Sequence, residues 1–554
     1  MNSDLLIKEI STLSAKDILF VVGAGVSKNS PSNIPLGYEL TKYILDLACG
    51  EDESKVFINT WKEFSDEVNK YDSNLSFPIP RLETILGCID ELDNMLSRKP
   101  ILSGIADWAK VPPNDNHYIL SKFLNEGSNI ITTNFDLGIE NAYKNHFGPL
   151  KHQTIDGISI FSNKNSGSIC HIHGCAIDEI KQLGATIKRV KNGFSEKIET
   201  LLKRAINKSN LIIFVGYSVS DSFDITPFFQ NIHGTNILFI QHTINTDLPT
   251  SFPANLKKIA SHSTNLFKIG YDTTDFLKLL SNNILENITF HSSVSNVEFN
   301  WTNGFLNNNS AYNKDDQILN FLSLRYHLGI STDIFIKNRP TIQREIDNTY
   351  VTINNKNPRI EDYYKQATRS FTQLKSNETT QPKTVIHCKE KYINKEHLIL
   401  LKDECEYFID KYANLQLPIS KTDYLRMEWL LNLLNEYSLY TFKDVQYISY
   451  IIASLKYASA FSALLKKGCH PEYAQNELIL ALDISYIEGT IAALVHLAQH
   501  YIISDHRSQN SQAHIKQTLN ALSTAAKLAN LSGYLYHLER INRIIKSYNL
   551  NIDI

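Results

Sequence analysis

The sequence predicts an α/β fold in which an N-terminal parallel sheet is followed by a mostly α-helical C-terminal region. Three observations support this prediction. Short apolar segments rich in β-branched residues recur in the first half of the chain, longer amphipathic stretches separate them, and apolar residues at helical spacing dominate from Lys395 onward. Apolar strands that alternate with helices are typical of a parallel sheet covered on both faces.

Six segments are expected to form the strands of this sheet, because each is short, apolar and bounded by polar residues. They are residues 17–22, 129–132, 168–172, 210–215, 236–241 and 266–269. The alternation of strands and helices ends near Asn287. We therefore predict a Rossmann-like first domain at residues 1–287.

The rest of the chain is expected to form two further parts. Residues 288–394 are polar and rich in asparagine, which predicts either a connector or a small domain. In residues 395–554, apolar side chains such as Leu398, Leu401 and Cys405 recur at helical spacing. Such stripes usually bury against one another, so this part is predicted to be a domain of antiparallel helices.

The composition excludes several classes of protein. The 554 residues carry a net charge of −3, so no overall attraction to nucleic acid or to an anionic membrane is expected. No apolar stretch reaches the roughly 18 residues of a membrane span, and the N-terminus does not resemble a secretory signal. The seven cysteines are scattered and form no paired C-x-x-C motif. These features predict a cytoplasmic protein without disulfide bonds.

The stretch "ILFVVGAGVS", residues 18–27, places a Gly-Ala-Gly turn directly after the first predicted strand. Glycines let a backbone approach an anion closely, and a following helix offers free N–H groups, so the turn is a candidate phosphate cradle. The third glycine of the dinucleotide-binding motif G-x-G-x-x-G is absent. A tight turn with only a structural role remains the alternative.

Three further motifs follow predicted strands, where open α/β sheets bind ligands. They are "TTNFD" at 132–136, "HIHGC" at 171–175 and "GYSVSD" at 216–221. Each motif has a structural alternative: Asn134 and Asp136 are typical of turns and helix caps, and a lone histidine is often a core residue. A metal site at His171, His173 and Cys175 is disfavoured, because Gly174 interrupts the strand and no fourth ligand is evident.

The glycine turn and these three motifs, in this order, resemble the sirtuin family over residues 10–285. The resemblance implies a sheet of sirtuin type that binds NAD+. It implies that His173 is a general base and that Asn134 contacts the nicotinamide ribose and positions a water. The other implied contacts are Gly23, Ala24, Gly25 and Ser27 on the pyrophosphate, Phe135 and Asp136 at the nicotinamide carboxamide, and Gly216, Ser218 and Gln241 on the adenosine side.

The sequence departs from the protein-deacylating sirtuins in two places. The paired C-x-x-C zinc module is absent after Gly174, and the loop after Ser27 lacks the Asp-Phe-Arg segment. Without an acyl group to attack the ribose, water becomes the expected acceptor, so the predicted reaction is NAD+ hydrolysis with no metal. A non-hydrolytic sensor of NAD+ or ADP-ribose, and a protein deacylase or ADP-ribosyltransferase, remain alternatives.

This pattern resembles the sirtuin-like effectors of bacterial antiphage defence, such as the Thoeris effector. The resemblance implies abortive infection by NAD+ depletion, with residues 395–554 as a sensor or oligomerisation domain. It also implies a homo-oligomer and an activating partner, either a phage protein or a protein encoded in the same operon.

Overall fold

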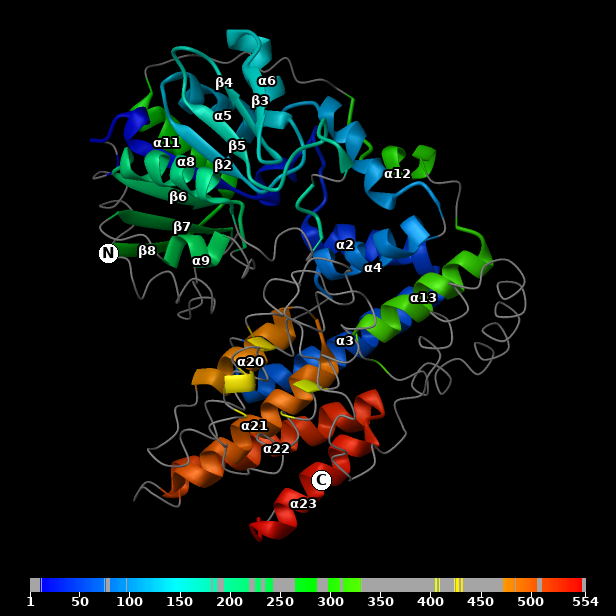
Figure 1. The fold of residues 1–554 in the computed structure, drawn as a ribbon. Helices are drawn as coiled ribbons and strands as arrows, with labels where there is room; N and C mark the ends of the chain where they lie inside the picture. The colour runs from blue at the N-terminus through cyan, green and yellow to red at the C-terminus, as the bar shows by residue number, and fades with distance from the viewer. Residues whose placement is uncertain are drawn as a thin grey trace. The chain divides into compact units, whose positions relative to one another are not determined.

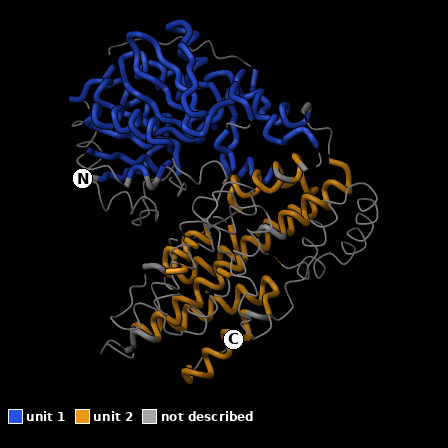
Figure 2. The backbone as a smooth tube through the Cα atoms, in the orientation of Figure 1, with its two compact units in different colours: residues 1–43, 97–311 blue, residues 44–96, 312–554 orange. Residues whose placement is uncertain are grey.

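The computed structural model divides the chain into two compact units, which Figure 2 colours separately. Unit 1 comprises residues 1–43 and 97–311, and unit 2 comprises residues 44–96 and 312–554. The residues that the structure describes are 10, 12–73, 75, 80–95, 97–180, 183–186, 194–218, 225–230, 235–242, 265–285, 297–308, 312–328, 330, 404–405, 408, 423, 425–427, 430–431, 472–483, 485–505 and 511–550.

Unit 1 is built on a sheet of eight strands (Figure 1). The strands are β1 (Ile18–Val22), β2 (Asn129–Thr132), β3 (Lys151–Ile155), β4 (Ile158–Ser162), β5 (Ser168–His171), β6 (Leu211–Val215), β7 (Asn236–His242) and β8 (Asn265–Tyr271). Their order is β3-β4-β5-β2-β1-β6-β7-β8, and the six strands from β5 to β8 in this order are parallel. All six predicted strands are present, with ends that differ by one or two residues at most.

The sheet is not parallel throughout, because β3 and β4 form an antiparallel hairpin at one edge. The sequence of β3 is polar and most of the strand is exposed, so it lacks the apolar pattern from which buried strands are predicted. Asp156 and Gly157 join the two strands with φ values of 49° and 80°. An Asp-Gly pair with positive φ is typical of a two-residue hairpin turn, and it was the signal that could have predicted this hairpin.

Helices of unit 1 cover both faces of the sheet and enclose two apolar cores. All of β1 is buried, with Phe20 in one core and Leu19 in the other. The first core includes Phe123 and Phe276, and the second includes Leu202. The α-helices of unit 1 are α5 (Asp115–Asn125), α6 (Gly138–Phe147), α8 (Glu196–Asn207), α9 (Ile225–Gln230), α11 (Thr273–Ile284) and α12 (Asn303–Asn308). Its 3-10 helices are η1 (Ala15–Asp17), η2 (Ala24–Ser27) and η3 (Ile101–Lys110). Burial on both faces explains why β1 and β6 are apolar at every position.

The described part of unit 2 is helical. Its helices are α3 (Glu51–Tyr71), α4 (Leu82–Met95), α13 (Lys314–Leu328), α20 (Glu472–Asp483), α21 (Ile487–Asp505), α22 (Ser511–Ser532) and α23 (Leu535–Ser547), and α2 (Gly37–Cys49) contains the division between the units. A buried hydrogen bond joins α20 to α21, with His496 Nδ1 at 2.7 Å from Glu477 Oε2. Among the described helices, none is both long enough and apolar enough to cross a membrane.

The two units differ from the predicted boundaries at 287 and 394. Residues 44–96, which the prediction placed in the first domain, are grouped with the C-terminal helices, and described residues 297–308 are grouped with the sheet. An amphipathic helix indicates that one of its faces is buried, but its sequence does not indicate which other helix covers that face. Most of the predicted part at 288–394 lies outside the described residues.

Candidate functional site

All the predicted site residues lie at or just after the carboxyl ends of β1, β2, β5, β6 and β7. The strand β1 lies between β2 and β6, so the chain builds one side of the sheet from β1 and then crosses over to build the other. Open parallel sheets bind ligands at such a reversal of strand order. The topology therefore brings motifs that are distant in the sequence to one edge of the sheet.

The Gly-Ala-Gly turn after β1 packs directly against the turn after β6. The Gly25 N–H donates to the Gly216 carbonyl oxygen at 2.9 Å. A Cβ atom on Gly23 would lie 2.6 Å from that oxygen, and a Cβ atom on Gly25 would lie 2.8 Å from the Gly216 Cα. Gly216 has a φ of 62°, which favours glycine. The close approach of two backbones is therefore sufficient reason for these glycines, and phosphate binding by the turn stays a prediction.

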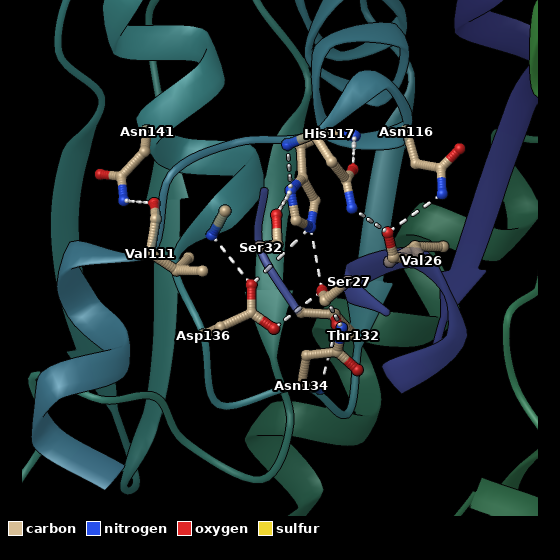
Figure 3. A network of polar contacts seen from close by, with 12 residues as sticks. Val26, Ser27, Ser32, Val111, Asn116, His117, Thr132, Asn134, Asp136 and Asn141 are labelled. Carbon is tan, nitrogen blue, oxygen red and sulfur yellow. Dashed lines mark hydrogen bonds and ion pairs between the residues drawn. The ribbon is translucent and has the colours of Figure 1, made fainter. Parts of the chain in front are cut away.

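Ser27 is fully buried, and its hydroxyl joins three parts of the site (Figure 3). The hydroxyl donates to Asp136 Oδ2 at 2.9 Å and accepts from Asn134 Nδ2 at 3.2 Å. His117 Nε2 lies 2.9 Å away, and His117 Nδ1 accepts the Asn114 N–H, so the proton of the neutral ring is on Nε2 and is donated to Ser27. The Ser27 hydroxyl thus donates one hydrogen bond and accepts two, which is its full capacity.

His117 belongs to this site, although the sequence did not identify it. It lies in the first turn of α5, and its N–H donates to the Asn114 side chain that caps the helix. Burial lowers the pKa of His117 in spite of the nearby carboxylates of Asp136 and Glu140, so the ring is neutral at pH 7. A histidine three residues after an N-cap asparagine is a visible signal of a capping arrangement, but it does not indicate that the ring reaches Ser27.

Asn134 is held through three of its atoms. Its N–H donates to Thr132 Oγ1 at 3.1 Å, its carbonyl oxygen faces His171 Nδ1 at 2.8 Å, and its Nδ2 donates to Ser27. The remaining polar atom, Oδ1, is buried and has no hydrogen-bond partner among the described residues. A buried acceptor without a partner costs about 1–3 kcal/mol, so a water or a ligand group that donates a hydrogen bond to Oδ1 would be stabilised there.

The frame around Asn134 also uses Asp136, which the resemblance placed at the nicotinamide carboxamide. Asp136 is buried, its Oδ1 accepts the Gly138 N–H at 2.9 Å, and its Oδ2 accepts the Ser27 hydroxyl. Both carboxylate oxygens are therefore bound within the protein. Contacts of Ser27 and Asp136 with a substrate stay predictions, whereas their hydrogen bonds place them in the frame that holds Asn134.

The loop after β5, which carries His173, is hydrogen-bonded to the β2 end and the loop that follows. The Ile172 N–H donates to the Thr132 carbonyl oxygen at 3.1 Å, and the Ala176 N–H donates to the Phe135 carbonyl oxygen at 2.7 Å. His173 lies between these two bonds in the sequence and is buried. The predicted base is thus on the same edge of the sheet as the predicted asparagine, from the neighbouring strand.

The alternative of a metal site at "HIHGC" gains no support from the side chains around it. Both ring nitrogens of His171 face oxygen atoms, of the Asn134 carbonyl and of Glu140. Burial raises the pKa of the Cys175 thiol to about 12, so the thiol remains protonated. Within the described ranges, no three His, Cys, Asp or Glu side chains are grouped so as to hold a metal ion.

The predicted adenosine side lies beyond the glycine turn, at the ends of β6 and β7. Ser218 follows Gly216 and is exposed. Gln241 lies near the end of β7, and its Oε1 is a second buried acceptor with no hydrogen-bond partner in the described part of the chain. Two such acceptors, on Asn134 and Gln241, therefore flank the central strands β1 and β6.

Comparison with protein families assigns part of this site to a known domain. The family model for the SIR2-like domain matches residues 128–236, which include Asn134, His173 and Gly216. A search of curated proteins found no match. SIR2-like domains use NAD+, so the domain indicates a sirtuin-type, NAD-related function. The resemblance is thus confirmed for residues 128–236, which hold three of the four motifs, and the chain carries a SIR2-like domain there.

Proposed function

We propose that this protein is an NAD+ hydrolase that cleaves the bond between nicotinamide and ribose and releases nicotinamide and ADP-ribose. The observation that carries the proposal is the Asn134 side chain, whose Nδ2 is bound to Ser27 while its buried Oδ1 has no partner among the described residues. An acceptor held in this way suits a ribose hydroxyl or an attacking water, since either one donates a proton to it.

The chemistry requires little more than positioning. Nicotinamide leaves with the electron pair of its bond to C1′, and the ribose passes through an oxocarbenium-like transition state, as in other glycoside cleavage. Water forms the new bond to C1′ and loses one proton, which His173 accepts. Asn134 orients the ribose or the water before the reaction. The reaction therefore avoids the loss of entropy that an encounter in solution would require.

The two buried acceptors fit the two ends of one dinucleotide. Asn134 Oδ1 would accept from the nicotinamide ribose or the water, and Gln241 Oε1 would accept from a hydroxyl or amine of the adenosine. The glycine turn after β1 lies between them in the strand order, which suits a pyrophosphate bound by Gly23, Ala24 and Gly25.

The alternatives make different demands on the same site. A deacylase or ADP-ribosyltransferase needs a site for a second substrate, and the paired C-x-x-C zinc module of the deacylases is absent from the sequence. A sensor that binds NAD+ without cleaving it does not need a base, and His173 at the same sheet edge as Asn134 favours cleavage. Product analysis separates all three.

We further propose a role in antiphage defence by NAD+ depletion in the bacterial cytoplasm, with a phage protein or an operon-encoded protein as the trigger and a homo-oligomer as the working form. Unregulated NAD+ hydrolysis would kill the host, so such an enzyme requires an inactive state. The described part of unit 2 is helical, and as a compact unit of its own it suits the role of sensing the trigger or assembling the oligomer.

Product analysis of the full-length protein tests the hydrolase. NAD+ is incubated with wild type, His173→Ala and Asn163→Ala, and nicotinamide, ADP-ribose and cyclic ADP-ribose are separated by chromatography. Asn163 is an exposed turn residue and serves as the control. We expect linear ADP-ribose from wild type and the control, and at least a ~100-fold lower rate from His173→Ala. Intact NAD+ in vitro, in expressing cells and during phage infection would contradict the proposal.

Regulation by unit 2 predicts that damage to its core changes the activity of unit 1. Glu477→Ala removes the buried hydrogen bond to His496 Nδ1, and loss of a buried hydrogen-bond partner costs about 1–3 kcal/mol. Gln475→Ala, on the exposed face of the same helix, is the matched control. We expect Glu477→Ala, but not Gln475→Ala, to alter the NADase rate and the toxicity on expression. Equal behaviour of the two variants in both assays would exclude this form of regulation.

A further inference from the structure

His171 and Glu140 form a buried pair that the proposed reaction does not use directly. His171 is 1% exposed and lies at the end of β5, and Glu140 lies in the first turn of α6. His171 Nε2 is 2.7 Å from Glu140 Oε1, and His171 Nδ1 is 2.8 Å from the Asn134 carbonyl oxygen. The ring therefore connects α6 to the backbone of the residue that presents the unpaired acceptor.

The two distances determine where the protons are. A carbonyl oxygen only accepts, so Nδ1 carries a proton and donates it to Asn134. The Nε2–Oε1 contact needs a proton between the two atoms as well, since a bare ring nitrogen and a carboxylate repel each other. Loss of that proton must break one of the two contacts: either Nε2 faces Glu140 without a hydrogen, or Nδ1 faces the Asn134 carbonyl without one.

The surroundings favour retention of this proton. Burial by itself would lower the pKa of His171, but Glu140, the Asn134 carbonyl and Asp136 outweigh burial and raise it above 6.5. From β4, Phe161 packs against the ring in a T-shaped arrangement, with ring centroids 5.5 Å apart. The groups that face the ring in the described structure are therefore acidic, polar or apolar, and none of those identified is cationic.

We propose that the protonated His171–Glu140 pair is a positioning device for Asn134, and that the site loses its reactive geometry when the pair loses its proton. This inference rests on the proposed NAD+ hydrolysis. Ser27 holds the Asn134 side chain from one direction, and His171 holds its backbone from another. Removal of either contact lets Oδ1 move, and a displacement of about 1 Å at a reacting centre can cost about 100-fold in rate.

Two substitutions at His171 separate this role from a merely structural one. An asparagine amide nitrogen occupies nearly the position of Nδ1, so His171→Asn keeps a donor for the Asn134 carbonyl and loses the contact with Glu140. A glutamine amide nitrogen corresponds to Nε2, so His171→Gln keeps the contact with Glu140 and loses the donor. We expect kcat within about tenfold of wild type for His171→Asn and about 100-fold lower for His171→Gln, with KM for NAD+ little changed in both.

Glu140→Gln tests the proton itself. The glutamine amide donates to Nε2 of a neutral ring, so both contacts persist without the additional proton. Because the pKa of His171 is raised above 6.5, the pair keeps its proton at acid pH and fully positions Asn134 there. This positioning is lost as the pH rises through that pKa. We expect kcat of the wild type to fall on the alkaline side, and Glu140→Gln to lack this fall. Any fall in kcat on the acid side should remain in both proteins.

The protonation state of His171 is also measured by NMR, which does not require an activity assay. In full-length protein labelled with ¹⁵N-histidine, the resonances missing from the His171→Asn spectrum belong to His171, and their shifts distinguish a doubly protonated ring from a neutral one. A doubly protonated ring at pH 7 in wild type and a neutral ring in Glu140→Gln are expected. A neutral ring in wild type, or equal kcat for His171→Asn and His171→Gln in an active enzyme, would overturn the positioning role. A protonated ring in a protein that never hydrolyses NAD+ would instead overturn the proposed function.

Discussion

Asn134→Ala is expected to lower kcat for NAD+ hydrolysis by about 100- to 1000-fold, the range found when one pre-organised polar group is removed from an active site. The substitution removes the buried Oδ1 acceptor and the Nδ2 donor to Ser27 together. Because Ser27 keeps its bonds to His117 and Asp136, the frame of the site should remain folded. The measurement is nicotinamide release under saturating NAD+, with a thermal unfolding curve for each protein.

Asn134→Asp tests whether an acceptor oxygen is sufficient for activity or whether the hydrogen bond from Nδ2 to Ser27 is also needed. This change keeps the size of the side chain and an acceptor oxygen, but it replaces the Nδ2 donor by a carboxylate oxygen. The single proton of the Ser27 hydroxyl is already donated to Asp136, so the new carboxylate would face a lone pair and a second buried carboxylate. We therefore expect Asn134→Asp to be almost as inactive as Asn134→Ala. Activity within threefold of wild type in either variant, measured beside Asn163→Ala, would show that Asn134 is not at the reacting centre.

Gly23→Ala is expected to destabilise unit 1 by about 1–3 kcal/mol and to abolish hydrolysis, because overpacked positions force their neighbours to move. The added Cβ would lie 2.6 Å from the Gly216 oxygen and 2.7 Å from the Tyr217 Cα, both of which are backbone atoms. Backbone atoms cannot rotate away as the end of a side chain can, so the turns after β1 and β6 must separate. Denaturant unfolding and nicotinamide release measure the two effects.

Gly37→Ala is the matched control for this prediction. Gly37 begins α2, and a Cβ placed there meets no atom within 4 Å. Alanine in a helix restricts the unfolded chain, so stability should be unchanged or higher by about 0.4–1 kcal/mol. Wild-type stability and activity in Gly23→Ala would mean that the two glycine turns do not depend on their close approach.

The sequence predicted the positions of the motifs better than their roles. The strands before Gly23, Asn134 and His173 were recognised from short apolar runs, and a parallel sheet brings their carboxyl ends to one edge. The hairpin β3–β4 was missed because an exposed edge strand has no apolar pattern. The grouping of residues 44–96 with the C-terminal helices was missed because an amphipathic stripe does not identify its partner.

The sequence by itself therefore determined the parallel part of the sheet, the order of the motifs at its strand ends and the SIR2-like character of residues 128–236, because these depend on local apolar periodicity and on motifs at strand ends. Only the tertiary structure decided that Ser27, itself bonded to His117, holds the Asn134 amide, that His171 holds its backbone, and that Oδ1 has no partner among the described residues. These hydrogen-bond partners lie 37 to 107 residues apart and are selected by the packing of their segments, so no local pattern in the sequence encodes which donor meets which acceptor.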